Sequence, residues 1–192
     1  MKIDSPNAIG ESTGFGIPTG GTANQILVKN SSTNYDTSWS DSPVPTLVQA
    51  QNTSGQSIAN NGTPIVTGWS NIISQNAAEW NATTGVFTAT KSGTYLVSSN
   101  LTYAAKAAGQ TANIVNVQVV KNSTAQAIST MAATNTTTVV KGTGTATAIL
   151  NLVVGDTITI RTFQDLGSAA LLNTTAGWNN VTIQELPSRI RR

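Results

Sequence analysis

The strongest constraint on the fold is a series of short segments, between residues 46 and 186, in which apolar and polar residues alternate. The alternation is clear in Ala112–Lys121, Thr145–Val153 and Thr157–Phe163. A period of two places successive side chains on opposite faces of a β-strand. Clusters of Gly, Asn, Ser and Thr separate these segments and favour turns. No convincing helix of ten or more residues stands between them, so the sequence predicts an all-β sandwich.

The same pattern gives the positions of the strands. We expect them at Thr46–Ala50, Pro64–Thr67, Trp69–Ile73, Gly85–Thr90, Gly93–Leu101, Ala112–Lys121, Thr145–Val153, Thr157–Phe163 and Trp178–Glu185. Two turns precede alternating runs and contain a glycine, Gly93 and Gly155, for which we expect a positive φ. About eight strands in a domain of this size are typical of a jelly roll.

The polar surface is built from hydroxyl and amide groups rather than from charges. Thr, Ser and Asn make up 68 of the 192 residues, and only 9% of the residues are charged, against about 25% in an average soluble domain. Thr favours strands, whereas Asn and Ser favour turns. This composition suits an extracellular or virion protein whose surface meets other proteins or glycans, and fits an ordinary cytosolic enzyme poorly.

The chain lacks the residues that several kinds of catalytic and metal sites require. The chain has no Cys and no His, which removes disulfides, the usual zinc ligands and a Ser-His-Asp triad. The carboxylates Glu79, Asp156, Asp165 and Glu185 are scattered, and Asp156 with Asp165 is too small a set for a calcium cage. Two of the four could still meet in space as a glycosidase pair. We expect a protein that is not an enzyme and binds no metal or other cofactor.

The charge distribution indicates no nucleic-acid partner. The net charge is +2, but without Arg189, Arg191 and Arg192 the chain has 7 basic and 8 acidic residues. The other basic residues are isolated from one another, unlike those of a nucleic-acid groove. No apolar run approaches the roughly 20 residues of a membrane span, and the first ten residues lack a signal-peptide core. We therefore expect neither nucleic-acid binding nor membrane insertion.

We divide the chain into an extended N-terminal segment (1–42), a head domain (43–187) and a basic tail (188–192), with Pro43 and Pro45 in an extended linker. Within the N-terminal segment, residues 26–28 form a short β-prone run. Tyr35 and Trp39 offer large apolar surfaces with nothing local to bury them. We expect this segment to become ordered only against a partner or against copies of itself.

Residues 17–39 resemble a short module of bacteriophage tail-fibre, baseplate and other appendage proteins. The matching residues are Pro18, Gly20, Gly21, Thr22, Gln25, Leu27, Lys29, Tyr35, Asp36 and Trp39. The resemblance implies that residues 1–42 attach the protein to other virion proteins.

Residues 80–101 resemble the signature of complement globular-head and tumour-necrosis-factor-like jelly rolls. The matching residues are Trp80, Gly85, Phe87, Gly93 and Tyr95, with Gly155 and Asp156 further along the chain. The resemblance implies a homotrimer of jelly rolls. We expect Phe87 and Tyr95 to lie on adjacent strands joined by a hairpin and to face the core. Both faces of residues 114–120 have apolar or β-branched character, as if one face met a neighbouring subunit.

Together these features predict a trimeric phage fibre or appendage, located on the virion and assembled in the host cytoplasm, whose head binds a host-surface glycan or protein. The candidate receptor contacts are Trp69, Trp178 and the loop 104–111. Two alternatives stay open: a capsid decoration or head-fibre protein anchored by residues 1–42, and a secreted bacterial jelly-roll adhesin.

Overall fold

The computed structural model describes residues 18–187 except 19, 24, 34–35, 42–43, 75–77, 105–113 and 133–141; residues 1–17 and the basic tail 188–192 lie outside the described part. The chain divides into two compact units, Met1–Val44 and Pro45–Arg192. The described residues form strands, bridges and turns and no helix. The prediction of an all-β chain is confirmed.

The first unit contains a β-hairpin. Strands β1 (Gln25–Lys29) and β2 (Thr37–Asp41) are antiparallel, and Leu27 lies opposite Trp39. We call these two strands, with the turn between them, the N-terminal hairpin. The β-prone run expected at residues 26–28 is the middle of β1, and the strand that pairs with it comes from the Ser- and Thr-rich sequence around Trp39.

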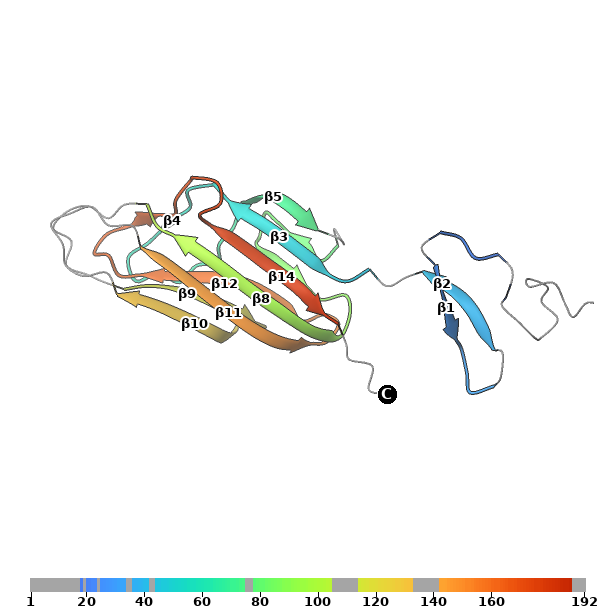
Figure 1. Ribbon diagram of the computed structural model, residues 1–192. Helices are drawn as coiled ribbons and strands as arrows, with labels where there is room; N and C mark the ends of the chain where they lie inside the picture. Colours follow the sequence, from blue (N-terminus) through green and yellow to red (C-terminus); the bar gives the residue numbers. More distant parts are fainter. Residues whose placement is uncertain are drawn as a thin grey trace, which may run out of the picture. The chain divides into compact units, whose positions relative to one another are not determined.

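The second unit, the head, is a sandwich of two five-stranded antiparallel sheets (Figure 1). The β8 sheet has the order β11 (Thr143–Leu152), β8 (Gly93–Thr102), β14 (Asn180–Leu186), β3 (Leu47–Asn52) and β5 (Trp69–Ser74). The β12 sheet has the order β10 (Thr124–Ala132), β9 (Ile114–Lys121), β12 (Thr157–Gln164), β7 (Val86–Thr88) and β6 (Trp80–Asn81). A short pair, β13 (Ala170–Leu171) and β4 (Ser57–Ile58), closes one end. Neighbouring strands distant in sequence, such as β3 and β14, are typical of a jelly roll.

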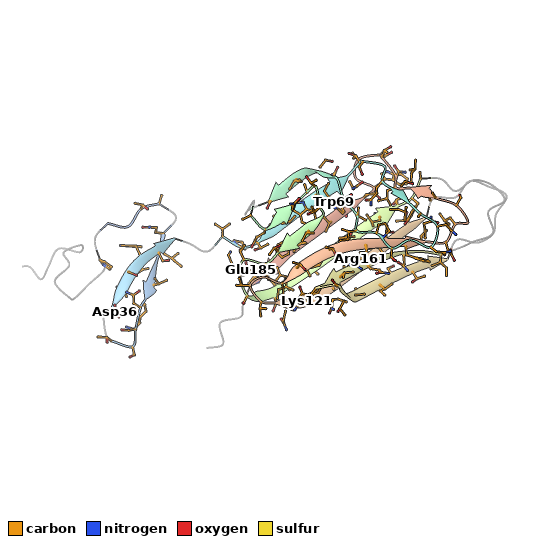
Figure 2. All side chains as sticks on the ribbon, turned by 180° about the vertical axis from the view of Figure 1, so that it is seen from behind. Asp36, Trp69, Lys121, Arg161 and Glu185 are labelled. Atoms are coloured by element: carbon orange, nitrogen blue, oxygen red, sulfur yellow. The ribbon has the colours of Figure 1, made fainter. Side chains whose placement is uncertain are left out.

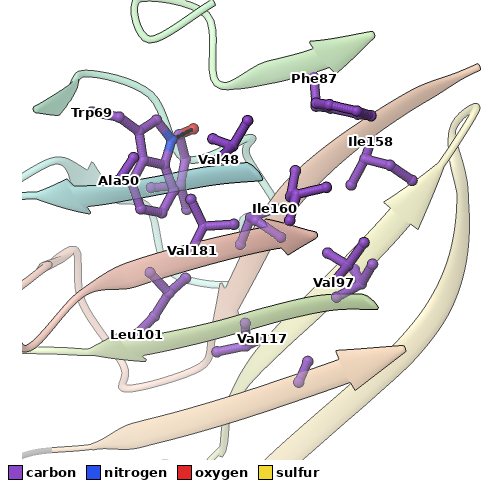
Figure 3. Close-up of a cluster of buried hydrophobic side chains, with 14 of the residues drawn as sticks. Val48, Ala50, Trp69, Phe87, Val97, Leu101, Val117, Ile158, Ile160 and Val181 are labelled. Atoms are coloured by element: carbon purple, nitrogen blue, oxygen red, sulfur yellow. Dashed lines mark hydrogen bonds between the residues drawn. The ribbon is translucent and has the colours of Figure 1, made fainter. Parts of the chain in front are cut away.

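The core lies between the two sheets, where the alternating apolar residues meet (Figure 3). Val97 and Ile183 from the β8 sheet, and Phe87, Val119 and Ile158 from the β12 sheet, are completely buried. Burial of each such side chain stabilises the fold by roughly 1.5–3 kcal/mol. The alternation in the sequence is therefore the alternation between core and surface.

Strand β10 is not among the strands expected from the sequence, although it pairs with β9 along its length. On the face of β9 that points away from the core, Val120 is only 2% exposed within a single chain. On the same face Ile114 is 38% exposed, so the contact of this face with a neighbouring subunit stays a prediction.

Phe87 and Tyr95 are not on adjacent hairpin strands. Phe87 is on β7, which pairs with β6 and β12, whereas Tyr95 is on β8, which pairs with β11 and β14. The chain between them crosses from one sheet to the other. Their rings meet across the core, with centroids 5.9 Å apart and planes tilted by 60°, so the expectation that both face the core is confirmed.

Candidate functional site

Trp39 contacts two other residues of the phage-like segment, Pro18 and Gly21. Its Nε1 donates a hydrogen bond to the carbonyl oxygen of Pro18 (2.7 Å). Its ring lies over Gly21, where an added Cβ would be 2.5 Å from Cε2 of Trp39. The expectation that nothing local covers Trp39 is therefore wrong, because Pro18 and Gly21 contact the indole. Only glycine leaves room for that contact.

Other residues of this segment form a turn at the start of β1 and a turn between β1 and β2. At the start of β1, the backbone N–H of Thr22 donates to Oε1 of Gln25 (3.1 Å), and Gly20 has φ +96°. Between the strands, Asn30 Nδ2 donates to Asp36 Oδ1 (3.1 Å), and the Ser31 hydroxyl donates to Asp36 Oδ2.

These hydrogen bonds, first that of Ser31 and then that of Asn30, lower the pKa of Asp36. Tyr35 lies outside the described residues.

The jelly-roll signature residues form the packed parts of the head. Gly85 has φ +68°, and an added Cβ would be 2.1 Å from the carbonyl oxygen of Val66. Trp80 is buried and meets Trp69 edge to face, with centroids 5.9 Å apart. Gly93 begins β8 without a positive φ, so that expectation is wrong, whereas Gly155 has φ +90° as expected.

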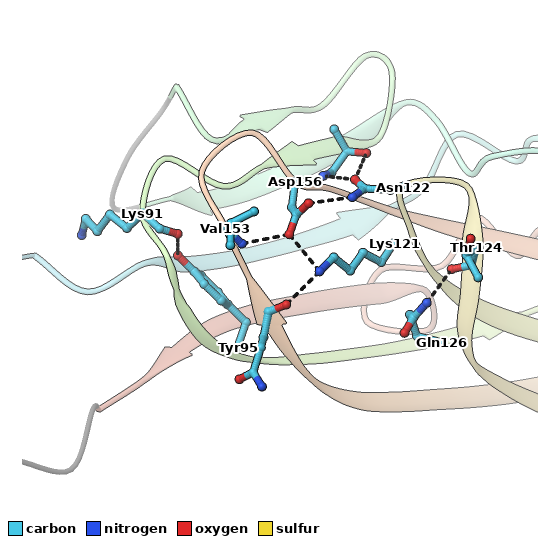
Figure 4. A network of polar contacts seen from close by, with 10 residues as sticks. Lys91, Tyr95, Lys121, Asn122, Thr124, Gln126, Val153 and Asp156 are labelled. Carbon is cyan, nitrogen blue, oxygen red and sulfur yellow. Dashed lines mark hydrogen bonds and ion pairs between the residues drawn. The ribbon is translucent and has the colours of Figure 1, made fainter. Parts of the chain in front are cut away.

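Asp156 is the centre of a polar network that joins two turns at one end of the head (Figure 4). Its Oδ2 pairs with Lys121 Nζ (2.8 Å) and accepts from the N–H of Val153 (2.8 Å). Its Oδ1 accepts from Asn122 Nδ2 (2.6 Å). The hydrogen bond from Lys121, then those from Val153 and Asn122, lower the pKa of Asp156 to about 2. Asp156 is thus tied to the structure of the head.

The two tryptophan candidates for receptor contact differ in exposure. Trp69 is only 5% exposed, and its Nε1 donates to the carbonyl oxygen of Val66 (2.8 Å). It is a core residue, and the expectation of a receptor contact is wrong for it. Trp178 is 38% exposed. Of the loop 104–111, only Ala104 belongs to the described residues.

Trp178 lies at the end of the head opposite the linker. It precedes β14, and near the other end of that strand Glu185 Oε2 accepts from the N–H of Thr46 (3.0 Å), the second residue of the head unit. The Thr46 hydroxyl also donates to the buried carboxylate of Glu79 (3.0 Å). We call the end that includes Trp178 the distal end. Asn100 Nδ2 there donates to the carbonyl oxygen of Trp178 (2.9 Å).

The outer face of the β8 sheet carries no ionisable side chain among the described residues. We call it the neutral face; its residues are Gln49, Gln51, Ile73, Thr94, Leu96, Ser98, Asn100, Thr145, Thr147, Ile149, Asn151, Thr182 and Gln184. Hydroxyl and amide groups link β8 to β11 across this face, as in the pair of Ser98 and Thr147 (3.0 Å) and the pair of Thr94 and Asn151 (2.9 Å). A hollow lined in part by Gln49 and Ile73 interrupts it.

The structure suggests no metal centre and no membrane span within its described part. No three His, Cys, Asp or Glu side chains gather there in a group that could hold an ion. Likewise, the described residues include no helix long and apolar enough to cross a bilayer.

No protein-family model matches the chain, and no curated protein matches it by sequence. Solved structures resemble it in fold. The crystal structure of murine APRIL at pH 5.0 has a TM-score of 0.56 and 11% identity, covering 74% of this chain and 100% of that one. The globular domain of zebrafish complement 1qA protein gives 0.56 and 13%, covering 76% and 100%. Eiger TNF from S. frugiperda gives 0.57 and 12%, covering 78% and 99%. The predicted tumour-necrosis-factor-like and complement-like jelly roll is therefore confirmed as a fold.

Proposed function

We propose that this chain is a bacteriophage structural protein: a trimeric fibre or appendage that its first unit attaches to the virion and whose head binds the host surface. The observation that carries the attachment role is the contact of Trp39 with Pro18 and Gly21. Residues that resemble the phage module converge there on one side chain. A flexible leader without a role would not require these residues to contact one another.

The N-terminal hairpin has the features of a docking element. Ile26 is 42% exposed and Leu27 is 39% exposed, and they are neighbours on β1. Their side chains therefore point to opposite faces of the hairpin. An isolated two-stranded hairpin is only marginally stable in water. A partner surface on the particle would bury these side chains and supply the missing stability.

The attachment role can be tested on particles. Gold-labelled antibody against the head should mark one location on purified virions, and Trp39→Ala should remove the protein from them. Ser40→Ala, an exposed neighbour on β2, is the matched control and should leave labelling unchanged. Circular dichroism should show that the head still folds when residues 1–42 are deleted. If Trp39→Ala or the deletion variant still assembles onto particles, the attachment hypothesis fails.

The neutral face favours self-association into the proposed trimer. Burial of a charged group on association is costly, and the cores of protein interfaces are depleted of charged residues. Ile149 is 66% exposed and lies opposite Leu96, so an apolar pair is available near the middle of two strands. The head can therefore bury this face against another copy without removing a charge from water.

Ile149→Lys tests the trimer directly. Sedimentation equilibrium of the full chain should give a trimer, and the variant should dissociate into monomers, because each interface would bury an unpaired ammonium group. Val154→Lys is the matched control: Val154 is 64% exposed but lies in the turn after β11. A stable monomer at micromolar concentration would refute the trimer. Dissociation by both variants would refute the role of the neutral face.

The distal end is the part of the head that we propose meets the host. Trp178 offers an exposed aromatic surface beside Asn100 and Asn180. Amides bind sugar hydroxyls, and indole rings pack against the apolar face of a sugar. Trp178→Ala should reduce adsorption of particles to the host without changing their protein content. Normal adsorption would remove Trp178 from the receptor site.

The location found by antibody labelling also separates the alternatives. Label over the capsid would indicate a decoration or head-fibre protein, and label at the tail would indicate a tail fibre. Absence from every particle, with the protein on a bacterial surface instead, would indicate an adhesin and refute the virion role.

A further inference from the structure

Arg161 is a cation with no ion pair among the described residues of the head. It lies in the middle of β12 (Figure 2), and its neighbours in sequence, Ile160 and Thr162, are buried in the core. Since side chains alternate along a strand, Arg161 points to the outer face of the β12 sheet. Its Nε atom is buried and has no hydrogen-bond partner. A buried donor without an acceptor is unfavourable. Arg161 as a whole is partly exposed, so a ligand can approach the side chain from solvent.

The register of the sheet surrounds Arg161 with neutral side chains. Gln118 lies opposite on β9, with Ile128 beyond it on β10, and Ile65 forms a bridge with Arg161 on the other side. Phe163 lies two residues after Arg161 on the same face of β12, opposite Asn116 on β9. We call these six residues the Arg161 patch. Within it Arg161 is the single charged residue.

The carboxylates of the head are already engaged. Asp156 pairs with Lys121 and Glu185 with Lys91, and these are the ion pairs of the described head. Glu79 accepts from the hydroxyls of Thr46 and Thr90. Asp165 accepts from the N–H of Ile114 (2.5 Å). The side-chain carboxylates of the described head are therefore engaged within the head itself, which favours a separate ligand as the source of an anion for Arg161.

We propose that the Arg161 patch binds a sugar that carries a carboxylate. A guanidinium group binds a carboxylate through two parallel hydrogen bonds. Gln118 Nε2 donates to Asn116 Oδ1 (3.2 Å), which orients the two amides and leaves Gln118 Oε1 and Asn116 Nδ2 for sugar hydroxyls. The half-buried Phe163 ring offers an apolar surface for the sugar ring. This site goes beyond the proposed function, which places host contact at the distal end.

The test is titration of the full chain with sodium glucuronate and with N-acetylneuraminate, followed by saturation-transfer NMR, with glucose as the neutral control. Both acidic sugars should give saturable binding that weakens with added salt, and glucose should not. Arg161→Gln should weaken binding about tenfold or more, because a charge-assisted contact is lost. Arg161→Lys should give an intermediate loss, because an ammonium group lacks the planar fork of a guanidinium. Lys29→Gln, which removes one positive charge from the other unit, should bind as the parent chain does.

The proposal is overturned if glucose binds as well as glucuronate, if neither acidic sugar binds, or if Arg161→Gln keeps the affinity of the parent chain. If Arg161→Gln does not fold, the decision rests on Arg161→Lys, and unchanged affinity in that variant overturns the proposal. None of these results depends on where the protein lies on a particle, so failure here leaves the virion hypothesis to its own test.

Discussion

The exchange of Gly85 for alanine tests whether the turn before β7 requires a residue without a Cβ. An alanine there has two costs. It must adopt φ +68°, which is unfavourable by about 1–2 kcal/mol for a residue with a Cβ. Its Cβ would also be 2.1 Å from the carbonyl oxygen of Val66, a distance at which that carbonyl must move.

The displaced carbonyl is the acceptor for Trp69 Nε1 at 2.8 Å. Loss of this buried hydrogen bond costs about 1–3 kcal/mol. The two costs together predict that Gly85→Ala lowers the free energy of unfolding by about 2–5 kcal/mol. Gly155→Ala is the matched control, because Gly155 has φ +90° but no atom within 4 Å of an added Cβ. Gly155→Ala should lower the free energy of unfolding only by the cost of the positive φ, about 1–2 kcal/mol.

Urea unfolding of the full chain, followed by tryptophan fluorescence, measures both variants. Protein concentration must be the same in every sample, because association contributes to apparent stability. The midpoint should fall further for Gly85→Ala than for Gly155→Ala, without a change in slope. Equal losses within about 0.5 kcal/mol would refute the argument from the Val66 carbonyl.

Three further predictions concern ionisation and the core. The pKa of Asp156 is about 2 in the folded chain against an ordinary value of 3.8. The contribution of the ionised carboxylate to stability is therefore complete above pH 3.8 and is lost as the pH falls through 2. Asp156→Asn should make unfolding less dependent on pH in that range, and an unchanged acid profile would contradict the network. Burial raises the pKa of Tyr103 from 10.0 to about 12. The stability that the protonated phenol contributes is present below pH 10 and is lost as the pH rises through 12. Circular dichroism against pH should therefore show that Tyr103→Phe unfolds less steeply in alkali than the parent chain. Tyr103→Phe should also cost about 1 kcal/mol at neutral pH through its bond to Thr162 (2.8 Å). Phe87→Ala should cost about 3–5 kcal/mol in urea unfolding, because the ring is completely buried; a loss below 1 kcal/mol would contradict its place in the core.

The sequence alone determined the fold class and most strands of the head. Side-chain alternation depends only on the geometry of one strand, so it can be read without knowing the neighbours. That is why the segments that became β8, β11, β12 and β14 were predicted close to their true bounds. The edge strand β10 was missed because its alternation runs through Thr, Ala, Gln and Ser, whose contrast in polarity is weak and which include no core anchor as large as those of β9.

Only the tertiary structure decided which side chains meet. Phe87 and Tyr95 are eight residues apart and still belong to different sheets, and Trp69 is buried although its sequence surroundings resemble those of the exposed Trp178. The position of Arg161 among neutral side chains follows from the order of strands β12, β9 and β10. Strand pairing is a long-range property, set by which faces can be buried together, and no local pattern contains it. For the same reason the fold of Pro18 and Gly21 over Trp39 could not be read from the individual residues.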